Sequence, residues 1–255
     1  MRGLRLIAVF LVSCLIASSA RAADLKVLSA GALEAGLVPL AGAYGAATGH
    51  NVRVEIATPP TIRQRLMAGE TADIVILPPA VLDDPAIAKN IDMSSRRLIG
   101  RVGIGIAVHV DAEAPAIATA EDIRAALLAA DSVVYNTAST GTYFAKLIEQ
   151  MSIADAVKAK ATIYPSGQEV MAHLARGGAR ARAVGIGPLT EIHLYLRKGV
   201  KLVGPLPSDI QNYTSYVGVL MRGNTTPAAA FLESLRAPAA QETFRATGVE
   251  MSAAR

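Results

Sequence analysis

Apolar residues recur with two different periods between residues 26 and 77, and the two periods alternate along the chain. Three short apolar runs predict strands: Lys26–Leu28, Val52–Ile56 and Asp73–Leu77. Leu33–Tyr44 has apolar residues at helical spacing before Gly49, and a shorter helical pattern begins at Ile62 and ends at Gly69. Pro39 lies inside the first helical pattern and predicts a kink or a late helix start. The predicted order is strand, helix, strand, helix, strand.

This alternation predicts a parallel sheet with right-handed crossovers, and the unbroken apolar run Asp73–Leu77 is typical of a strand buried on both faces. Ligands of such sheets bind beyond the carboxyl ends of the strands. The predicted strand ends are Ser29–Ala32, Thr58–Thr61 and Pro78-Pro79. We therefore expect Ser29, Gly31 and Ala32 to contribute to a site for a small anion.

A long β run at Arg101–Val110 introduces a second set of elements. Expected helices are Glu121–Ala130, Gly141–Met151, Gln168–Arg176, Pro227–Arg236 and Ala239–Thr247. Expected strands are Ser132–Tyr135, Thr162–Tyr164, Ala183–Ile186, Lys201–Val203 and Tyr213–Met221. We expect residues 23–105 plus 205–255 to form one lobe and residues 106–204 a second. Two such α/β lobes around a cleft suit closure on a ligand.

The first 22 residues have the three parts of a removable export signal. Arg2 and Arg5 form a positively charged start, Leu6–Ala17 is apolar, and Ala20–Ala22 has the small-x-small form that signal peptidase cleaves. A transmembrane anchor is disfavoured because a bilayer span needs roughly 20 apolar residues. Residues 11–14 also resemble a lipobox, but little apolar sequence precedes them, so we favour cleavage without lipidation. We expect cleavage near Ala22-Ala23 and a periplasmic mature chain.

Removing this signal changes the charge and the available chemistry. It contains three of the 25 basic residues and no acid, so the formal charge falls from +4 to +1 and gives no reason to expect nucleic acid. Cys14, the only cysteine, is lost too, so the mature chain has no disulfide, thiol nucleophile or cysteine ligand. The histidines lack metal-ligand spacing, and no nucleophile elbow or Walker loop occurs. We expect neither a metal nor a cofactor.

Hydroxyl side chains are most concentrated at Asn136–Tyr143, where a helix is expected to begin. Unpaired N–H groups and the positive end of the helix dipole suit an anionic ligand. Ser139, Thr140 and Thr142 are therefore candidate ligand contacts, and simple capping of the helix by Ser139 or Thr140 is the alternative. Gln168 stands at a similar helix start and has the same two interpretations.

Other candidates lie after the second strand and in the last β run. Thr58 and Thr61 flank two prolines at a helix start, where a rigid start to the helix is the alternative function. Arg63, on the first turn of that helix, can reach a carboxylate with two hydrogen bonds or lie exposed on the helix face. Tyr213 and Tyr216 are interpreted as packing residues with solvated hydroxyl groups.

Four segments carry a family resemblance: Leu25–Leu33, Met67–Leu77, Arg101–Val108 and Tyr143–Leu147. In order and over essentially all of the mature chain, they resemble the molybdate-binding type of periplasmic solute-binding protein. The resemblance implies an α/β fold of the two-lobe, class II periplasmic-binding-protein type. Each lobe would then be a mainly parallel sheet flanked by helices, with the ligand cleft between the lobes.

The resemblance also implies where the ligand contacts fall. In that family, neutral donors from five loops hold a tetrahedral oxyanion. The two serine positions fall on Ala32 and Pro59, the tyrosine position on or beside Pro188, and the two backbone positions near Thr140 and Gln168. Alanine and proline side chains have no hydrogen-bond donor. The implied scaffold is therefore an anion-binding one whose ligand differs from molybdate.

Two functions remain open on this basis. The first is a periplasmic substrate-binding protein that binds a small oxyanion or carboxylate for an ABC transporter. The second is an isomerase, because some exported proteins that resemble this family are aconitate isomerases, which move a proton on a tricarboxylate without a cofactor. Glu169 and His173, four residues apart, would then carry the proton, and a solvent-facing polar pair is the alternative. The expected partners are the anion and an ABC permease, with a monomeric chain and no nucleic acid.

Overall fold

The computed structural model describes residues 22–177, 182–223 and 226–251. The predicted export signal lies, except for its last residue, outside the described residues, so its cleavage stays a prediction. Nine strands in the described part of the chain are ordered β2-β1-β3-β9-β4-β7-β5-β6, and β8 pairs with β4 beside this path. No described helix is long and apolar enough to cross a membrane.

The first lobe contains a five-stranded part of this arrangement. Its strands are β1 (Asp24–Ala30), β2 (Asn51–Ala57), β3 (Ile74–Leu77), part of β4 (Ile91–His109) and β9 (Tyr213–Met221). Its helices are α1 (Glu34–Thr48), α2 (Pro59–Met67), α3 (Pro79–Leu82), α4 (Pro85–Ala88), α10 (Thr226–Ser234) and α11 (Pro238–Ala246), with a 3-10 turn η1 (Gly31–Leu33) after β1. β1 pairs in parallel with β2 and β3, as the alternating pattern predicts, whereas β9 is antiparallel to β3 and β4.

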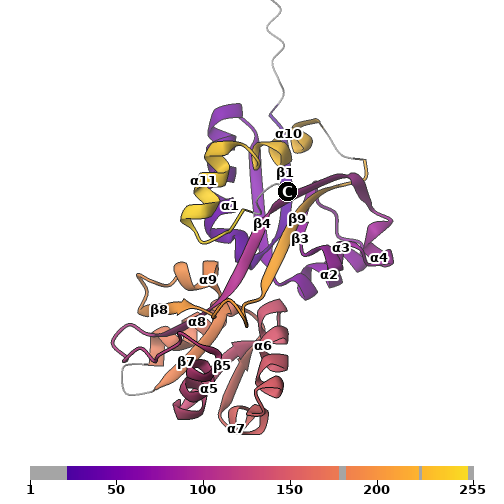
Figure 1. Cartoon of the computed structure of the whole chain (residues 1–255). Coiled ribbons are helices and arrows are strands. Elements are labelled where there is room, and N and C mark those ends of the chain that lie inside the picture. The colour runs from indigo at the N-terminus through magenta and orange to yellow at the C-terminus, as the bar shows by residue number, and fades with distance from the viewer. Residues whose placement is uncertain (1–21, 178–181, 224–225, 252–255) are drawn as a thin grey trace, which may run out of the picture.

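The second lobe repeats this α/β arrangement. Its strands are the end of β4 with β5 (Ser132–Asn136), β6 (Ala161–Tyr164), β7 (Ala183–Pro188) and β8 (Val200–Pro205). Its helices are α5 (Ala120–Ala129), α6 (Ser139–Gln150), α7 (Ala154–Lys158), α8 (Gly167–Gly177) and α9 (Leu189–His193). β5 pairs in parallel with β6 and β7. Figure 1 shows the two lobes one above the other, with β4 and β9 running between them.

β4 is longer than the sequence pattern predicts. The expected run began at Arg101, but the strand begins at Ile91 and pairs with β9 as far as Gly103, then with β7 from Ile104 onward. The pairing register shifts between Asp92 and Arg97, and three of the four intervening residues are polar. Because such an irregularity interrupts the two-residue alternation, the first half of this strand lacks the usual strand signal.

Helix α1 begins at Glu34, five residues before Pro39, so the predicted late start is wrong. Proline removes one backbone donor from the helix. The helix continues through it because its inner face, which includes the buried Leu37 and Ala41, packs against the first sheet. It ends at Gly49, whose φ of 76° is in the left-handed region that glycine adopts without strain.

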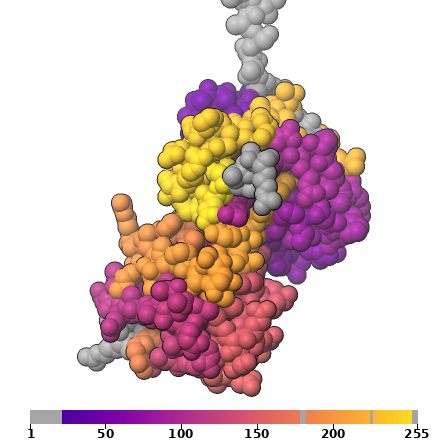
Figure 2. Space-filling view, viewed as in Figure 1, coloured from indigo at the N-terminus to yellow at the C-terminus, as the bar shows by residue number. Residues whose placement is uncertain are grey.

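The buried apolar side chains form separate clusters in the two lobes. One cluster draws on residues 25–102 and 216–249, and two others draw on residues 104–206. Figure 2 shows the corresponding surface as an upper and a lower body joined by a narrower middle. Each lobe thus has its own hydrophobic core, and the clusters change between residues 102 and 104 and between residues 206 and 216. The lobe boundaries at residues 105 and 205 stay a prediction.

Candidate functional site between the lobes

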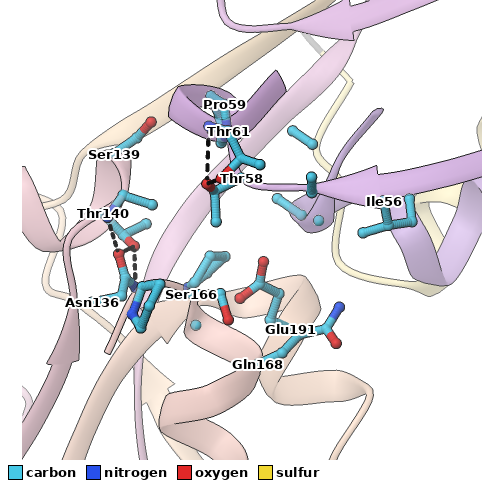
Figure 3. A pocket seen from close by; sticks show the side chains of 18 of the residues that line it. Ile56, Thr58, Pro59, Thr61, Asn136, Ser139, Thr140, Ser166, Gln168 and Glu191 are labelled. Carbon is cyan, nitrogen blue, oxygen red and sulfur yellow. Dashed lines mark hydrogen bonds between the residues drawn. The ribbon is translucent and has the colours of Figure 1, made fainter. Parts of the chain in front are cut away.

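A cavity of about 340 Å³ lies where strands of both sheets end. From the first lobe it is lined by residues after β1 and at the start of α2, together with Tyr216 of β9. From the second lobe it is lined by the starts of α6 and α8 and by Pro188 and Glu191 at the β7–α9 connection (Figure 3). The cavity thus occupies the position that the strand-end rule predicts.

Two threonines provide the hydroxyl groups on the first-lobe side. Thr58 is the N-cap of α2, and its hydroxyl group lies 2.8 Å from that of Thr61 (Figure 3). The Thr61 N–H donates to Thr58 Oγ1 at 3.4 Å, so Thr58 caps the helix as well as lining the cavity. Gly31 and Ala32 line the same side. These four residues are brought together as the sequence predicts.

The start of α6 faces the cavity from the second lobe, but its cap differs from the expected one. Asn136 Oδ1 accepts the Ala138 N–H at 2.8 Å and the Gly141 N–H at 3.3 Å, and Asn136 Nδ2 donates to Thr140 Oγ1 at 3.0 Å. The alternative interpretation, in which Ser139 or Thr140 caps this helix, is therefore wrong. The N–H groups of Ser139 and Thr140 precede the first intrahelical bond, from residue 142 to Ala138, and are available to an anion.

Helix α8 begins at the cavity with a capping box. The Ser166 N–H and hydroxyl donate to Glu169 Oε2 at 3.1 and 2.7 Å, and the Glu169 N–H donates to Ser166 Oγ at 3.3 Å. This reciprocal pair fixes the first turn of the helix. Gln168 lines the cavity as predicted, and its side-chain amide donates to Glu34 at the start of α1. This hydrogen bond joins the two lobes directly.

Glu191 is the most unusual group in the cavity. It is only 6% exposed, and its Oε2 atom has no hydrogen-bond partner among the described residues. Figure 3 shows its carboxyl group pointing into the cavity beside Gln168 and Ser166. Burial and, to a smaller extent, the negative charge of Glu34 raise the pKa of Glu191, a hydrogen bond from the Gln168 backbone N–H lowers it, and together they bring it to about 8. A pKa in this range favours the protonated carboxyl group at neutral pH.

Tyr216 of β9 lines the cavity close enough to Glu191 of α9 for the two groups to interact electrostatically. It is 4% exposed and belongs to the first-lobe core, so it packs as predicted, but it also lines the cavity. Burial and the charge of Glu191 raise the pKa of its hydroxyl group, which is neutral and can donate a hydrogen bond at any physiological pH. Tyr213 lies elsewhere, with the Arg101 guanidinium group 4.0 Å from the centre of its ring.

Four predicted site residues do not line the cavity. Ser29 is fully buried within β1 and donates to the Ala30 carbonyl at 3.3 Å, because its position on the strand turns it into the core. Arg63 instead pairs with Asp84, with Nε 2.7 Å from Oδ2, so its guanidinium group is already held. Thr142 is exposed on α6 and, unlike Ser139 and Thr140 of the same helix, does not line the cavity.

The fourth is His173, which was paired with Glu169 in the isomerase hypothesis. His173 Nδ1 lies 3.0 Å from the Tyr164 hydroxyl group and does not line the cavity. Glu169 lines the cavity rim but is held by Ser166. The two side chains thus have separate partners, because one faces the helix start and the other faces β6. Pro78-Pro79, the third predicted strand end, also lies outside the cavity lining.

Sequence reasoning missed Glu191, Asn136 and Ser166 as cavity residues and assigned Tyr216 to packing alone. A signal for Glu191 was present, since this acidic residue stands five residues after the end of the apolar run Ala183–Ile186. The strand-end rule, applied to this strand as well, selects it. Among the described residues, no group of three or more His, Cys, Asp or Glu side chains could hold a metal ion.

All five positions onto which the family's donors fall line this cavity: Ala32, Pro59, Thr140, Gln168 and Pro188. The overall fold is shared with solved binding proteins. The periplasmic molybdate-binding protein of Azotobacter vinelandii superposes with a TM-score of 0.69 at 16% identity, over 90% of this chain and 100% of that one. A sulfate-binding protein from Mycobacterium tuberculosis superposes with a TM-score of 0.69 at 16% identity, over 90% of this chain and 87% of that one.

Sequence comparison gives the family. An aconitate isomerase from a Pseudomonas species is 30% identical over 231 residues, which cover 88% of this chain and 85% of the relative. The family model for bacterial extracellular solute-binding proteins matches residues 25–250, which include both lobes and every residue of the cavity. The chain therefore belongs to the family of bacterial extracellular solute-binding proteins.

Proposed function

We propose that this protein is a periplasmic receptor that binds a small oxyanion or carboxylate between its lobes and delivers it to an ABC permease. The observation that carries the proposal is the convergence of two helix starts, those of α6 and α8, on a cavity that both lobes line. Helix starts bind anions through free N–H groups and the positive end of the helix dipole.

The hydroxyl groups around the cavity support the same ligand class. Ser139 and one hydroxyl of the Thr58–Thr61 pair can donate to an anion oxygen without adding a positive charge, whereas the Ser166 hydroxyl already donates to Glu169. The export signal supports a periplasmic location, with cleavage near residues 22 and 23.

Ligand binding can be tested on the mature chain, residues 23–255, by thermal shift and calorimetry with sulfate, molybdate, phosphate, succinate and trans-aconitate. We expect at least one anion to stabilise the fold, by about 4 kcal/mol at a thousandfold excess over its dissociation constant. Ser139→Ala should weaken that binding several-fold, because it removes a cavity hydroxyl group at the start of α6. Thr142→Ala, on the same helix but exposed outside the cavity, is the matched control and should bind like wild type. A folded protein that binds none of these anions would contradict the proposal.

One observation favours a second function, the isomerisation of an unsaturated tricarboxylate. Glu191 is a buried acid with a pKa of about 8, which suits a group that takes up and returns a proton at neutral pH. The 30% identity with an aconitate isomerase supports this alternative. Against it, the ionisable side chains that line the described cavity are two glutamates and a tyrosine, which is unfavourable for three substrate carboxylates.

Proton NMR distinguishes these functions directly. The mature protein is incubated with trans-aconitate, and the signals of the cis isomer are followed over time. The receptor proposal expects no conversion beyond the rate in buffer. Conversion that Glu191→Gln abolishes would instead establish the isomerase, with Glu191 as its proton carrier.

A further inference from the structure

Glu191 lies against the backbone of both lobes. A Cβ atom placed on Gly31 of η1 would lie 2.9 Å from Glu191 Oε1, and one placed on Gly167 of α8 would overlap Oε2. The carboxyl group thus occupies space that a side chain would fill at either glycine. Its Oε2 atom is buried without a hydrogen-bond partner among the described residues, so the carboxyl group in this cavity lining has an unmet hydrogen bond.

The groups that face Glu191 from its neighbours add no positive charge. On α1, the negative charge of Glu34 raises the pKa of Glu191. On β9, Tyr216 has a neutral hydroxyl group, and the charge of Glu191 raises its pKa. On α8, Gln168 is a neutral amide, and the exposed carboxylate of Glu169 is held by its own cap. The residues of η1 and β7 that line the cavity beside it carry no ionisable side chain.

The cationic groups on the other elements packed against α9 have partners elsewhere. On β4, Arg101 pairs with Glu250 at 3.0 Å, and on β8, Lys201 donates to the Ala112 carbonyl at 2.6 Å. On α9 itself, His193 has a buried Nδ1 atom with no hydrogen-bond partner among the described residues, and a Cβ atom placed on Gly248 would lie 2.7 Å from it. Arg101, Lys201 and His193 form no ion pair with Glu191 among the described residues, so an anion in the cavity meets a buried carboxyl group without a paired cation.

Two negative charges in one buried site cannot both persist without a counter-charge, and such pairs share a proton. We infer that the anion is bound together with one proton, which is held between an oxygen of the ligand and the carboxyl group of Glu191. This inference rests on the proposed receptor function and predicts which anions the receptor prefers. A fully ionised anion shares a proton that Glu191 holds, whereas an anion with its own hydroxyl group can supply the shared proton itself.

The shared proton distinguishes two classes of ligand by pH. Burial raises the pKa of Glu191 to about 8, so the free site already holds the proton below that pH. Above it, a fully ionised anion such as sulfate or succinate must bring a proton from solvent, and its affinity should fall about tenfold per pH unit. Hydrogen phosphate carries a proton of its own, so its affinity should fall less steeply over the same range.

Calorimetry in buffers of different ionisation enthalpy measures both the affinity and the protons taken up. The probes are sulfate, succinate and phosphate, titrated into the mature protein between pH 6 and pH 9.5. For sulfate or succinate, proton uptake should rise from near zero at pH 6 toward one per bound anion at pH 9.5. Glu191→Gln should take up no proton and should bind the same anion at least tenfold more tightly than wild type at pH 9.5. Glu242→Gln removes an exposed carboxylate on α11 and should keep the wild-type profile.

The outcomes separate the inference from the proposed function. If none of the three anions binds at any pH to protein that circular dichroism shows to be folded, the proposed function and the inference both fail. If an anion binds with the same affinity and no proton uptake across the pH range, the receptor stands and the inference is overturned. A pH profile that Glu191→Gln leaves unchanged also overturns it, because the proton would then lie elsewhere.

Discussion

At the scale of single residues, the direction of a side chain decides whether it reaches the cavity. Ser29 and Gly31 belong to the same predicted strand end, yet Ser29 is fully buried in β1 and Gly31 lines the cavity. Ser29 lies inside β1, whereas Gly31 begins the 3-10 turn η1, where the chain leaves the strand and reaches the cavity. The strand-end rule therefore identifies the loops around the site, while it cannot choose between Ser29 and Gly31 within one loop.

The substitution Gly167→Ala tests whether anion binding depends on the close approach of the backbone to the carboxyl group of Glu191. A Cβ atom there would overlap Glu191 Oε2 and would lie 2.8 Å from Pro188 Cδ. Because the glutamate side chain can rotate away, Gly167→Ala should leave the protein folded but push the carboxyl group into the cavity. We expect anion affinity at pH 7 to fall at least tenfold by calorimetry.

Gly42→Ala is the matched control for this substitution. Gly42 lies inside α1, and a Cβ atom there would have no neighbour within 4 Å. Alanine should favour the helix by up to about 1 kcal/mol and leave anion affinity unchanged. Equal affinities of the Gly167→Ala and Gly42→Ala proteins would show that Glu191 has room to move without affecting the ligand.

At the scale of elements, length and regularity explain what the sequence predicts well. β9 runs over Tyr213–Met221 as predicted, and α6 and α8 lie within two residues of their expected bounds. α9 has only five residues, too few to show a helical period, so it was missed together with Glu191. The site is therefore less predictable than the fold, because Glu191 lies on α9, a helix too short to leave a periodic pattern in the sequence.

Asn136 tests how the start of α6 is fixed. It is 1% exposed, and its amide oxygen accepts the N–H groups of Ala138, which precedes the helix, and Gly141, in its first turn. Asn136→Ala removes these bonds and leaves buried donors unpaired, so urea denaturation should show a loss of about 1–2 kcal/mol in unfolding free energy. Asn136→Asp keeps the accepting oxygen and should lose less. An alanine variant as stable as wild type would mean that solvent replaces the cap.

At the scale of the whole molecule, the alternation of strands and helices predicts two α/β lobes. It does not predict which residues of the two lobes contact each other. Glu191 on α9 of the second lobe meets Gly31 of the first, and Gln168 bonds to Glu34 across the same boundary. These pairs are 160 and 134 residues apart in sequence (191 less 31; 168 less 34). No local pattern encodes such contacts, because they depend on how β4 and β9 set one lobe against the other.

The buried carboxyl group should also make the stability of the whole molecule depend on pH. An unfolded glutamate has a pKa near 4.5, and burial raises the pKa of Glu191 to about 8 in the folded state. Between these values the folded protein holds a proton that the unfolded chain releases, so raising the pH across this interval favours unfolding. The contribution of Glu191 is fully present below pH 4.5, falls by about 1.4 kcal/mol per pH unit and is lost above pH 8.

Glu191→Gln removes this contribution while it keeps the size of the side chain. In urea denaturation of the ligand-free protein, the difference in unfolding free energy between Glu191→Gln and wild type should grow in favour of the variant from pH 5 to pH 8. It should then level off, because both states of the wild-type glutamate are ionised above its folded pKa. Glu242→Gln, at an exposed helix position, should show no such growth. A difference that stays constant over this range would mean that Glu191 is already ionised in the folded cavity at pH 5, and that the cavity stabilises its charge despite its burial.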